Sequence, residues 1–231
     1  MTTPARRALE GSRALAAAGQ QDMVWGHVAV RDADGRGVWM KRSGLGFDEL
    51  TESDIHLVGW DGSVAEGEGK AHVESFIHLC VMRARPDVDA SVHTHPPAVN
   101  AFMALDEPLR ALSHEGVLFA RPQVPRSPLS GDLVSDVSRG DVLAGALRDA
   151  PACLMPRHGL LAVGDRIASA VMHAVLLEAA CGLHLRAAAA GPIRSYSDDA
   201  ELDAKRRNVW PPSQIDAGYA YLLRRWSAGR P

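Results

Sequence analysis

Ala90-Ser-Val-His-Thr-His-Pro-Pro97 joins a short apolar run to two histidines and two prolines. The run over 89–93 predicts a strand, and the prolines suit the first turn of a helix over 98–104. His93 and His95 therefore stand at i and i+2 where a strand ends, so their side chains leave one face with Cα atoms about 6–7 Å apart. Two such imidazoles can converge on one cation, since a Zn–N bond is about 2.0–2.1 Å long. A pair of structural histidines is the alternative, and the stiff Pro-Pro segment favours a site.

Two further residues could complete a metal site. His158 lies between Arg157 and Gly159, in a tight turn that joins two strand-like runs. A catalytic zinc site uses three protein ligands and leaves one position open for substrate, so a third histidine in a rigid turn fits that role. Glu74 begins a predicted helix after the glycine-rich segment 66–70, where an interaction with the helix dipole explains it equally well. The other histidines outside the motifs discussed here are interpreted as structural or surface residues: His56, His78, His114, His173 and His184.

Alternating strand-like and helix-like segments predict an α/β domain. Strands are expected over 26–32, 37–41, 55–60, 89–93, 152–155 and 160–163, and helices over 5–18, 72–85, 98–104, 138–150 and 165–190. Asp34-Gly35 predicts a hairpin between the first two strands. Because no repeat, low-complexity tract or linker is visible, residues 1–231 are expected to form one domain, with 191–231 as a C-terminal helical tail.

Composition excludes several classes of protein. The 231 residues carry a formal net charge of −3, which argues against a basic nucleic-acid-binding surface. The three cysteines, Cys80, Cys153 and Cys181, lack metal-ligand spacing and a disulfide pattern, which indicates a reducing compartment. Residues 5–18 do not read as a secretory signal, and the apolar stretch 167–190 contains ionisable groups that a membrane span would rarely hold. We therefore expect a cytoplasmic protein with neither a membrane nor a nucleic-acid partner.

Three motifs together resemble one known family. These are Arg83-Ala-Arg-Pro-Asp-Val88, the histidine-proline segment 90–97 and His158-Gly-Leu-Leu-Ala-Val-Gly164, and in this order along the chain they resemble the signature of the class II aldolase/adducin family. The resemblance covers about residues 5–190. It implies a three-layer α/β/α sandwich around a largely antiparallel central sheet. It also implies a homotetramer with sites near subunit boundaries.

The same resemblance implies roles for the residues discussed above. His93, His95 and His158 are expected to bind one divalent transition metal (Zn, Mn, Fe or Co), and Glu74 is expected to act as the catalytic acid/base. The aromatic residues of the C-terminal tail also favour a homo-oligomer, because a free tail should not expose them: Trp210, Tyr219, Tyr221 and Trp226.

The chain departs from the sugar-phosphate aldolases at the segments that hold phosphate in that branch. Their small hydroxyl and amide donors are replaced by Gly26-His27-Val28-Ala29, Lys41-Arg42-Ser43-Gly44 and His72-Val73. Guanidinium and imidazole donors suit a planar carboxylate, although Arg and Lys also bind phosphate. The predicted substrate-binding residues are therefore His27, Lys41, Arg42, Ser43 and His72.

Two tryptophan-containing segments, Trp25-Gly-His-Val-Ala-Val-Arg-Asp32 and Trp39-Met-Lys-Arg-Ser-Gly44, resemble the decarboxylase branch of the family. That branch acts on hydroxylated aromatic or pyridine dicarboxylates such as 3,4-dihydroxyphthalate; a core role for either tryptophan is the alternative. The resemblance implies a metal-dependent decarboxylase, a carbon–carbon lyase of aromatic catabolism, acting on a small molecule. Two alternatives stay open: an aldolase or dehydratase acting on a small hydroxy-carbonyl or sugar phosphate, and an adducin-like module that binds protein partners without catalysis.

Overall fold

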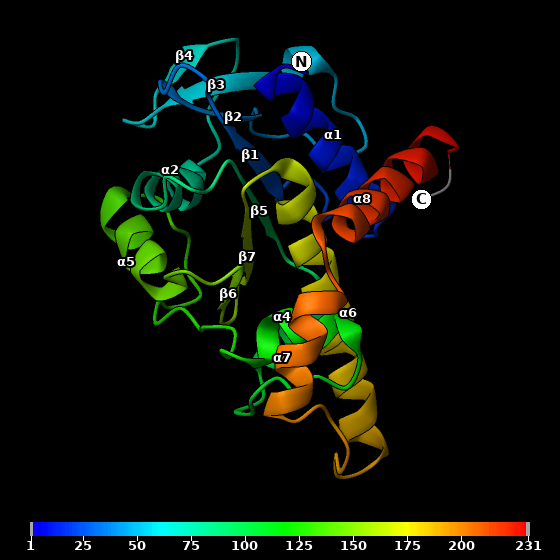
Figure 1. Ribbon diagram of the computed structural model, residues 1–231. Helices are drawn as coiled ribbons and strands as arrows, with labels where there is room; N and C mark the ends of the chain where they lie inside the picture. The colour runs from blue at the N-terminus through cyan, green and yellow to red at the C-terminus, as the bar shows by residue number, and fades with distance from the viewer. Residues whose placement is uncertain (1, 230–231) are drawn as a thin grey trace.

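The computed structural model describes residues 2–229, and its centre is an antiparallel sheet of seven strands (Figure 1). The strands are β1 (His27–Arg31), β2 (Gly37–Lys41), β3 (Ile55–Gly59), β4 (Val64–Glu66), β5 (Ala90–Thr94), β6 (Ala152–Met155) and β7 (Gly159–Gly164). Their order is β4-β3-β2-β1-β5-β7-β6, and every neighbouring pair is antiparallel. The expected antiparallel central sheet is confirmed.

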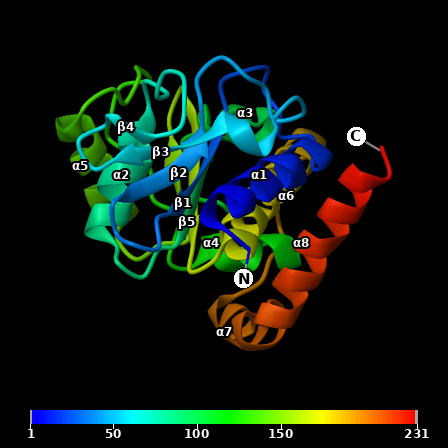
Figure 2. The same ribbon diagram turned by 90° about the horizontal axis from the view of Figure 1, so that it is seen from above.

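Helices cover both faces of this sheet (Figures 1 and 2). On one face lie α1 (Pro4–Ala17), α3 (Pro97–Met103), α6 (Ile167–Ala190) and α8 (Pro212–Ser227). On the other lie α2 (Ser75–Ala84) and α5 (Val137–Leu147). Strand β7 shows why three layers form: Leu160 and Ala162 pack with the first group of helices, and Leu161 and Val163 with the second. The three-layer α/β/α prediction is confirmed.

Helix α6 is the central element of the larger core. By length and composition it could cross a membrane, but 72% of its most apolar window is buried inside the protein, as expected of a core helix. Its Glu178 carboxylate accepts the backbone N–H groups of Ala98 (2.9 Å) and Val99 (2.8 Å) at the start of α3. This contact satisfies two free donors of the helix end and anchors the segment that follows the two predicted histidine ligands.

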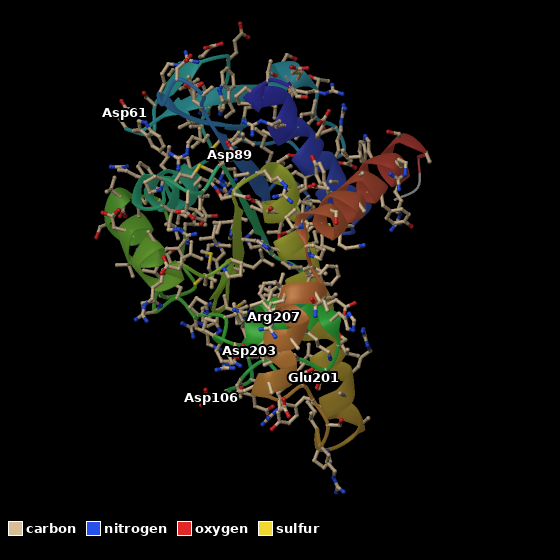
Figure 3. The ribbon with its side chains drawn as sticks, in the orientation of Figure 1. Asp61, Asp89, Asp106, Glu201, Asp203 and Arg207 are labelled. Carbon is tan, nitrogen blue, oxygen red and sulfur yellow. The ribbon has the colours of Figure 1, made fainter. Side chains whose placement is uncertain are left out.

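The C-terminal region contains α7 (Asp199–Asn208) and α8. Figure 3 labels Glu201, Asp203 and Arg207 on the exposed side of α7, whereas Leu202 packs against Val117, the first residue of the short helix α4 (Val117–Ala120). The aromatic surface expected of the tail is mostly covered, because α8 packs on α1 and α6. Tyr219 is buried in the core, and of the four aromatics named above Tyr221 alone counts among the exposed large hydrophobic residues, as does Tyr196 earlier in the tail.

Several boundaries differ from those expected. The helix expected over 72–85 begins at Ser75, so Glu74 is its N-cap residue rather than part of its first turn. The helix expected over 138–150 ends at Leu147, where Arg148 adopts a positive φ of 50°. The short helical turn that the sequence predicts within 48–54 is present as a 3₁₀ turn at Glu52–Asp54. The 3₁₀ turn at His114–Gly116 and the edge strand β4 are too short to produce a recognisable periodicity.

Candidate functional site

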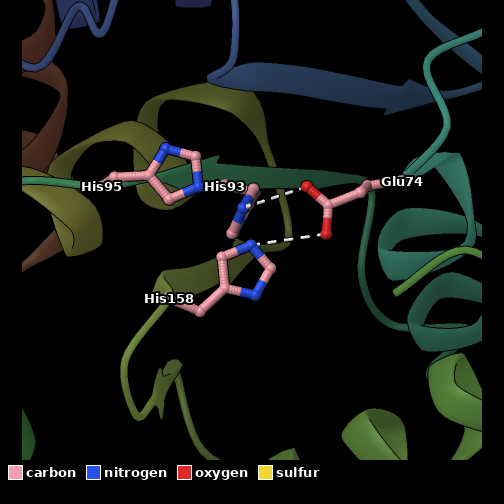
Figure 4. Close-up of side chains that lie close together, drawn as sticks. All are labelled: Glu74, His93, His95 and His158. Carbon is pink, nitrogen blue, oxygen red and sulfur yellow. Dashed lines mark ion pairs between the residues drawn. The ribbon is translucent and has the colours of Figure 1, made fainter. Parts of the chain in front are cut away.

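Four buried or half-buried residues from three segments, the end of β5, the start of α2 and the turn before β7, meet at one end of the sheet (Figure 4). Strand β5 pairs with β7 in the register Thr94↔Leu160, which places the turn before β7 beside the end of β5. The potential ligand atoms of Glu74, His93, His95 and His158 all lie within 4.8 Å of one another. Glu74 is 3.3 Å from His158, between Oε1 and Nε2, and 3.9 Å from His93, between Oε2 and Nε2.

Hydrogen bonds orient two of these histidines for metal binding. Nδ1 of His93 donates to the Leu160 carbonyl oxygen, and Nδ1 of His95 donates to the Asp22 carboxylate, each at 2.8 Å. Because neither acceptor can donate, the proton lies on Nδ1 and each Nε2 keeps its lone pair. Burial is the main cause that lowers the pKa of both rings, so both are neutral, the form that binds metals.

His93 Nε2 provides the test of whether a metal fits. This atom is buried and has no hydrogen-bond partner in the protein. A buried polar atom of this kind normally has a partner, and a divalent cation held by the three clustered histidines would supply it. The donor set, three imidazoles and a carboxylate, suits Zn, Mn, Fe or Co.

Glu74 lies between the histidines and the backbone of the loop before α5. Burial alone would raise its pKa, but the His158 side chain and the Val134 N–H, which donates to Oε1 at 2.9 Å, outweigh burial and hold the pKa below its usual value. The side chain is therefore a carboxylate in the free protein, able to accept a proton or to bind a cation.

A pocket of about 540 Å³ opens beside this cluster. Its lining consists of Asp22, Val24, Trp25, Ser43, Gly44, His72, Val73, Glu74, His95, Gly131, Leu133 and His158. Three of these residues, from three loops, are large, apolar and about half exposed: Trp25 (49%), Val73 (50%) and Leu133 (46%). We call them the apolar collar. The buried side chains of His72 and Glu74 form a polar floor below this collar, and Ser43 is exposed. Among the described lining residues there is no lysine or arginine.

Two of the five predicted substrate-binding residues, Ser43 and His72, line this pocket. His72 Nδ1 accepts the Glu74 backbone N–H at 3.2 Å, which leaves the proton on Nε2. Burial lowers the pKa of His72 to about 4, so the ring is a neutral N–H donor. Potential ligand atoms of His27, His72 and Glu74 also cluster within 4.8 Å, but a protonated Nε2 on His72 suits an anionic oxygen rather than a second cation.

The structure does not bring the other predicted substrate residues to the pocket lining. Lys41 is buried, and its Nζ donates to the carbonyl oxygens of Val24 (2.6 Å) and Leu45 (2.7 Å). Arg42 pairs with Asp54 at 2.9 Å. His27 is fully buried behind His72, their ring centroids 4.2 Å apart.

His78 and Ser91, together with His27, form a buried chain behind the pocket. His27 Nδ1 lies 2.6 Å from His78 Nε2, and His78 Nδ1 bonds to the Ser91 hydroxyl. His78 therefore has the structural role expected of it. The larger groove of the molecule, about 890 Å³ between α5 and residues 118–128, contains none of the predicted site residues.

Sequence reasoning missed Asp22, Val73 and Leu133 as parts of the pocket. Asp22 is 73 residues away from its partner His95, and it stands in a short irregular segment with no periodic pattern. Val73 and Leu133 are single apolar residues in loops, which carry no signal of their own.

Comparisons with known proteins agree with this geometry. The chain matches the family described as Class II Aldolase and Adducin N-terminal domain over residues 6–185. It is 32% identical over 203 residues to 3,4-dihydroxyphthalate decarboxylase from Arthrobacter keyseri, covering 82% of this chain and 81% of that protein. It is 29% identical over 176 residues to L-fuculose phosphate aldolase from Escherichia coli O6:H1, covering 75% and 79% of the two chains.

A solved structure shows the same relationship. L-fuculose 1-phosphate aldolase from Glaciozyma antarctica superimposes with a TM-score of 0.85 at 28% identity, covering 97% of this chain and 88% of that one. Class II aldolases use a divalent metal, and enzymes of this family act on small molecules. The matched residues include all four of the clustered side chains, Glu74, His93, His95 and His158. This chain belongs to the class II aldolase and adducin family.

Proposed function

We propose that the protein is a divalent-metal-dependent decarboxylase that acts on a hydroxylated aromatic carboxylate of the 3,4-dihydroxyphthalate kind. The apolar collar above a polar floor is the observation that carries this proposal. A planar ring can lie against Trp25, Val73 and Leu133 while its hydroxyl and carboxylate groups reach the floor. The similarity to a 3,4-dihydroxyphthalate decarboxylase supports the same substrate class.

The polar groups of the pocket lining favour a carboxylate over a phosphate dianion. The described lining offers the Ser43 hydroxyl and the His72 N–H but no lysine or arginine. A phosphate dianion would be compensated by few donors there, whereas one carboxylate needs only two. We assign Ser43 and His72 to the carboxylate that anchors the ring, with His27 behind His72.

In this proposal His93, His95 and His158 hold the metal, which supplies a Lewis acid for the negative charge that develops on a substrate oxygen. The Glu74 carboxylate accepts the proton of the substrate hydroxyl and returns it to the ring carbon that bears the departing carboxylate. The bond between that carbon and the carboxylate then breaks, CO2 leaves, and its bonding pair restores the aromatic ring. The product is a phenolate, which takes a proton from water.

An aldolase acting on a small hydroxy-carbonyl or sugar phosphate is the second candidate, favoured by the similarity to L-fuculose phosphate aldolase at nearly the same identity. The same metal ligands and Glu74 would serve it, because both reactions break a C–C bond next to a carbon conjugated to oxygen. A non-catalytic binding module is disfavoured by the presence of the whole His and Glu cluster. We further propose that the chain acts as one domain in a cytoplasmic homotetramer of aromatic catabolism.

A substrate panel tests the proposal. Purified protein loaded with Zn²⁺, Mn²⁺, Fe²⁺ or Co²⁺ is incubated with 3,4-dihydroxyphthalate, related hydroxylated dicarboxylates and L-fuculose 1-phosphate, and both CO2 and aldehyde are measured. We expect CO2 from an aromatic acid with a hydroxyl ortho to the lost carboxylate. Aldehyde from the sugar phosphate, with no CO2 from any aromatic acid, would establish the aldolase instead.

A further inference from the structure

The loop of residues 20–26 forms one wall of the pocket and is attached at three points. The Gln20 side-chain oxygen accepts the Thr94 hydroxyl at 2.9 Å, and the buried Lys41 holds the Val24 carbonyl. Between these two points the Asp22 carboxylate accepts His95 Nδ1–H at 2.8 Å. The middle attachment is therefore a direct bond to a proposed metal ligand.

Asp22 also accepts a backbone hydrogen bond from Trp25, the last residue of a turn in this loop. Its backbone carbonyl accepts the Trp25 N–H at 3.0 Å, which closes a turn over residues 22–25. Met23, inside this turn, has a positive φ of 44°, a conformation that a non-glycine residue adopts only when its surroundings impose it. Trp25 itself is 49% exposed, so core packing does not fix its position. The bond from its backbone N–H to the Asp22 carbonyl holds the backbone from which the indole projects.

One residue thus bonds a metal ligand with its side chain and a wall residue with its backbone. A cation at His95 Nε2 withdraws electron density from the ring and strengthens the bond from Nδ1–H to a carboxylate. We propose that Asp22 is a positioning residue that couples metal binding at His95 to the placement of Trp25 against the substrate. The inference rests on the metal site of the proposed function but is independent of which substrate is used.

The test compares Asp22→Ala and the isosteric Asp22→Asn with the wild type, and uses Asp34→Asn, an exposed carboxylate in the β1–β2 turn, as the matched control. Affinity for Zn²⁺ and Co²⁺ is measured by competition with a chromophoric chelator, without substrate. We expect Asp22→Ala to bind the metal about 10–100-fold more weakly, the usual effect of removing such a partner. Asp22→Asn should show a smaller loss, because it keeps an acceptor without the charge, and Asp34→Asn should show none.

Trp25 fluorescence is the second readout. If Asp22 only stabilised the fold, the Asp22→Ala substitution would not abolish the effect of metal on Trp25 quenching. Acrylamide quenching of the wild type minus that of Trp25→Phe isolates Trp25 from the other four tryptophans. Metal addition should protect Trp25 in the wild type and in Asp34→Asn, and this protection should be lost in Asp22→Ala at saturating metal. Unchanged metal affinity in both Asp22 variants, or full metal-dependent protection of Trp25 in Asp22→Ala, overturns the proposal. Neither result depends on whether CO2 or aldehyde is the product.

Discussion

Lys41 is a buried cation whose ionisation should be visible in the stability of the whole protein. The side chain is 1% exposed, and burial lowers its pKa from 10.5 to about 8. Between these two values the unfolded chain binds more protons at this site than the folded chain, so the free energy of unfolding rises with pH. Below pH 8 the cost of burying the charge is fully present, and by about pH 10.5 it is relieved.

The size of this effect follows from the two pKa values. A difference of 10.5 − 8 = 2.5 pKa units corresponds to a change on the order of 3 kcal/mol in the free energy of unfolding. Lys41→Met removes the titrating group, although it also leaves the Val24 and Leu45 carbonyls without this donor. The effect of the buried charge is therefore read from how the stability difference between the wild type and Lys41→Met changes with pH, and not from that difference at a single pH.

The assay is urea unfolding of the wild type and Lys41→Met at intervals from pH 7 to 10.5. We expect the stability of the wild type relative to the variant to be flat up to about pH 8 and to increase by about 3 kcal/mol above it. Lys70→Met, which removes an exposed lysine, should track the wild type at every pH. A stability difference between the wild type and Lys41→Met that does not change with pH would refute the reasoning.

Three further predictions concern the site and its support. His93→Ala should lose most of its bound divalent metal, and an unchanged metal content by elemental analysis would remove His93 from the ligand set. Glu74→Gln should keep the fold while turnover falls by roughly 10²-fold or more; near-normal turnover would place the proton donor elsewhere. Glu178→Gln should destabilise the protein by about 1–3 kcal/mol, because one of the two α3 N–H groups, on Ala98 or Val99, would face an amide NH₂ instead of an oxygen. An unchanged urea midpoint would contradict that last expectation.

The parts of the site that sequence could predict are those built from regular geometry. The i, i+2 spacing of His93 and His95 follows from strand periodicity, and a tight turn before a strand places His158 beside them once β5 and β7 pair. The direction of Lys41 could not be predicted in this way. Strand β2 is buried on both faces, so alternation does not reveal which side a polar residue takes. Its acceptors, the carbonyls of Val24 and Leu45, lie in irregular loops that only the folded chain brings together.

The division of the pocket between sheet and loops has an evolutionary consequence. Glu74 and His93 are buried and bonded into the framework, so only near-isosteric substitutions such as Glu74→Gln are expected to fit there. Val73 and Leu133 are about half exposed, and their replacement removes little core packing. Mutation can therefore remodel the substrate-facing rim while the reactive centre persists. A lineage that carries this architecture can vary the shape of the ligand admitted at the rim through single changes that leave the proposed metal ligands in place.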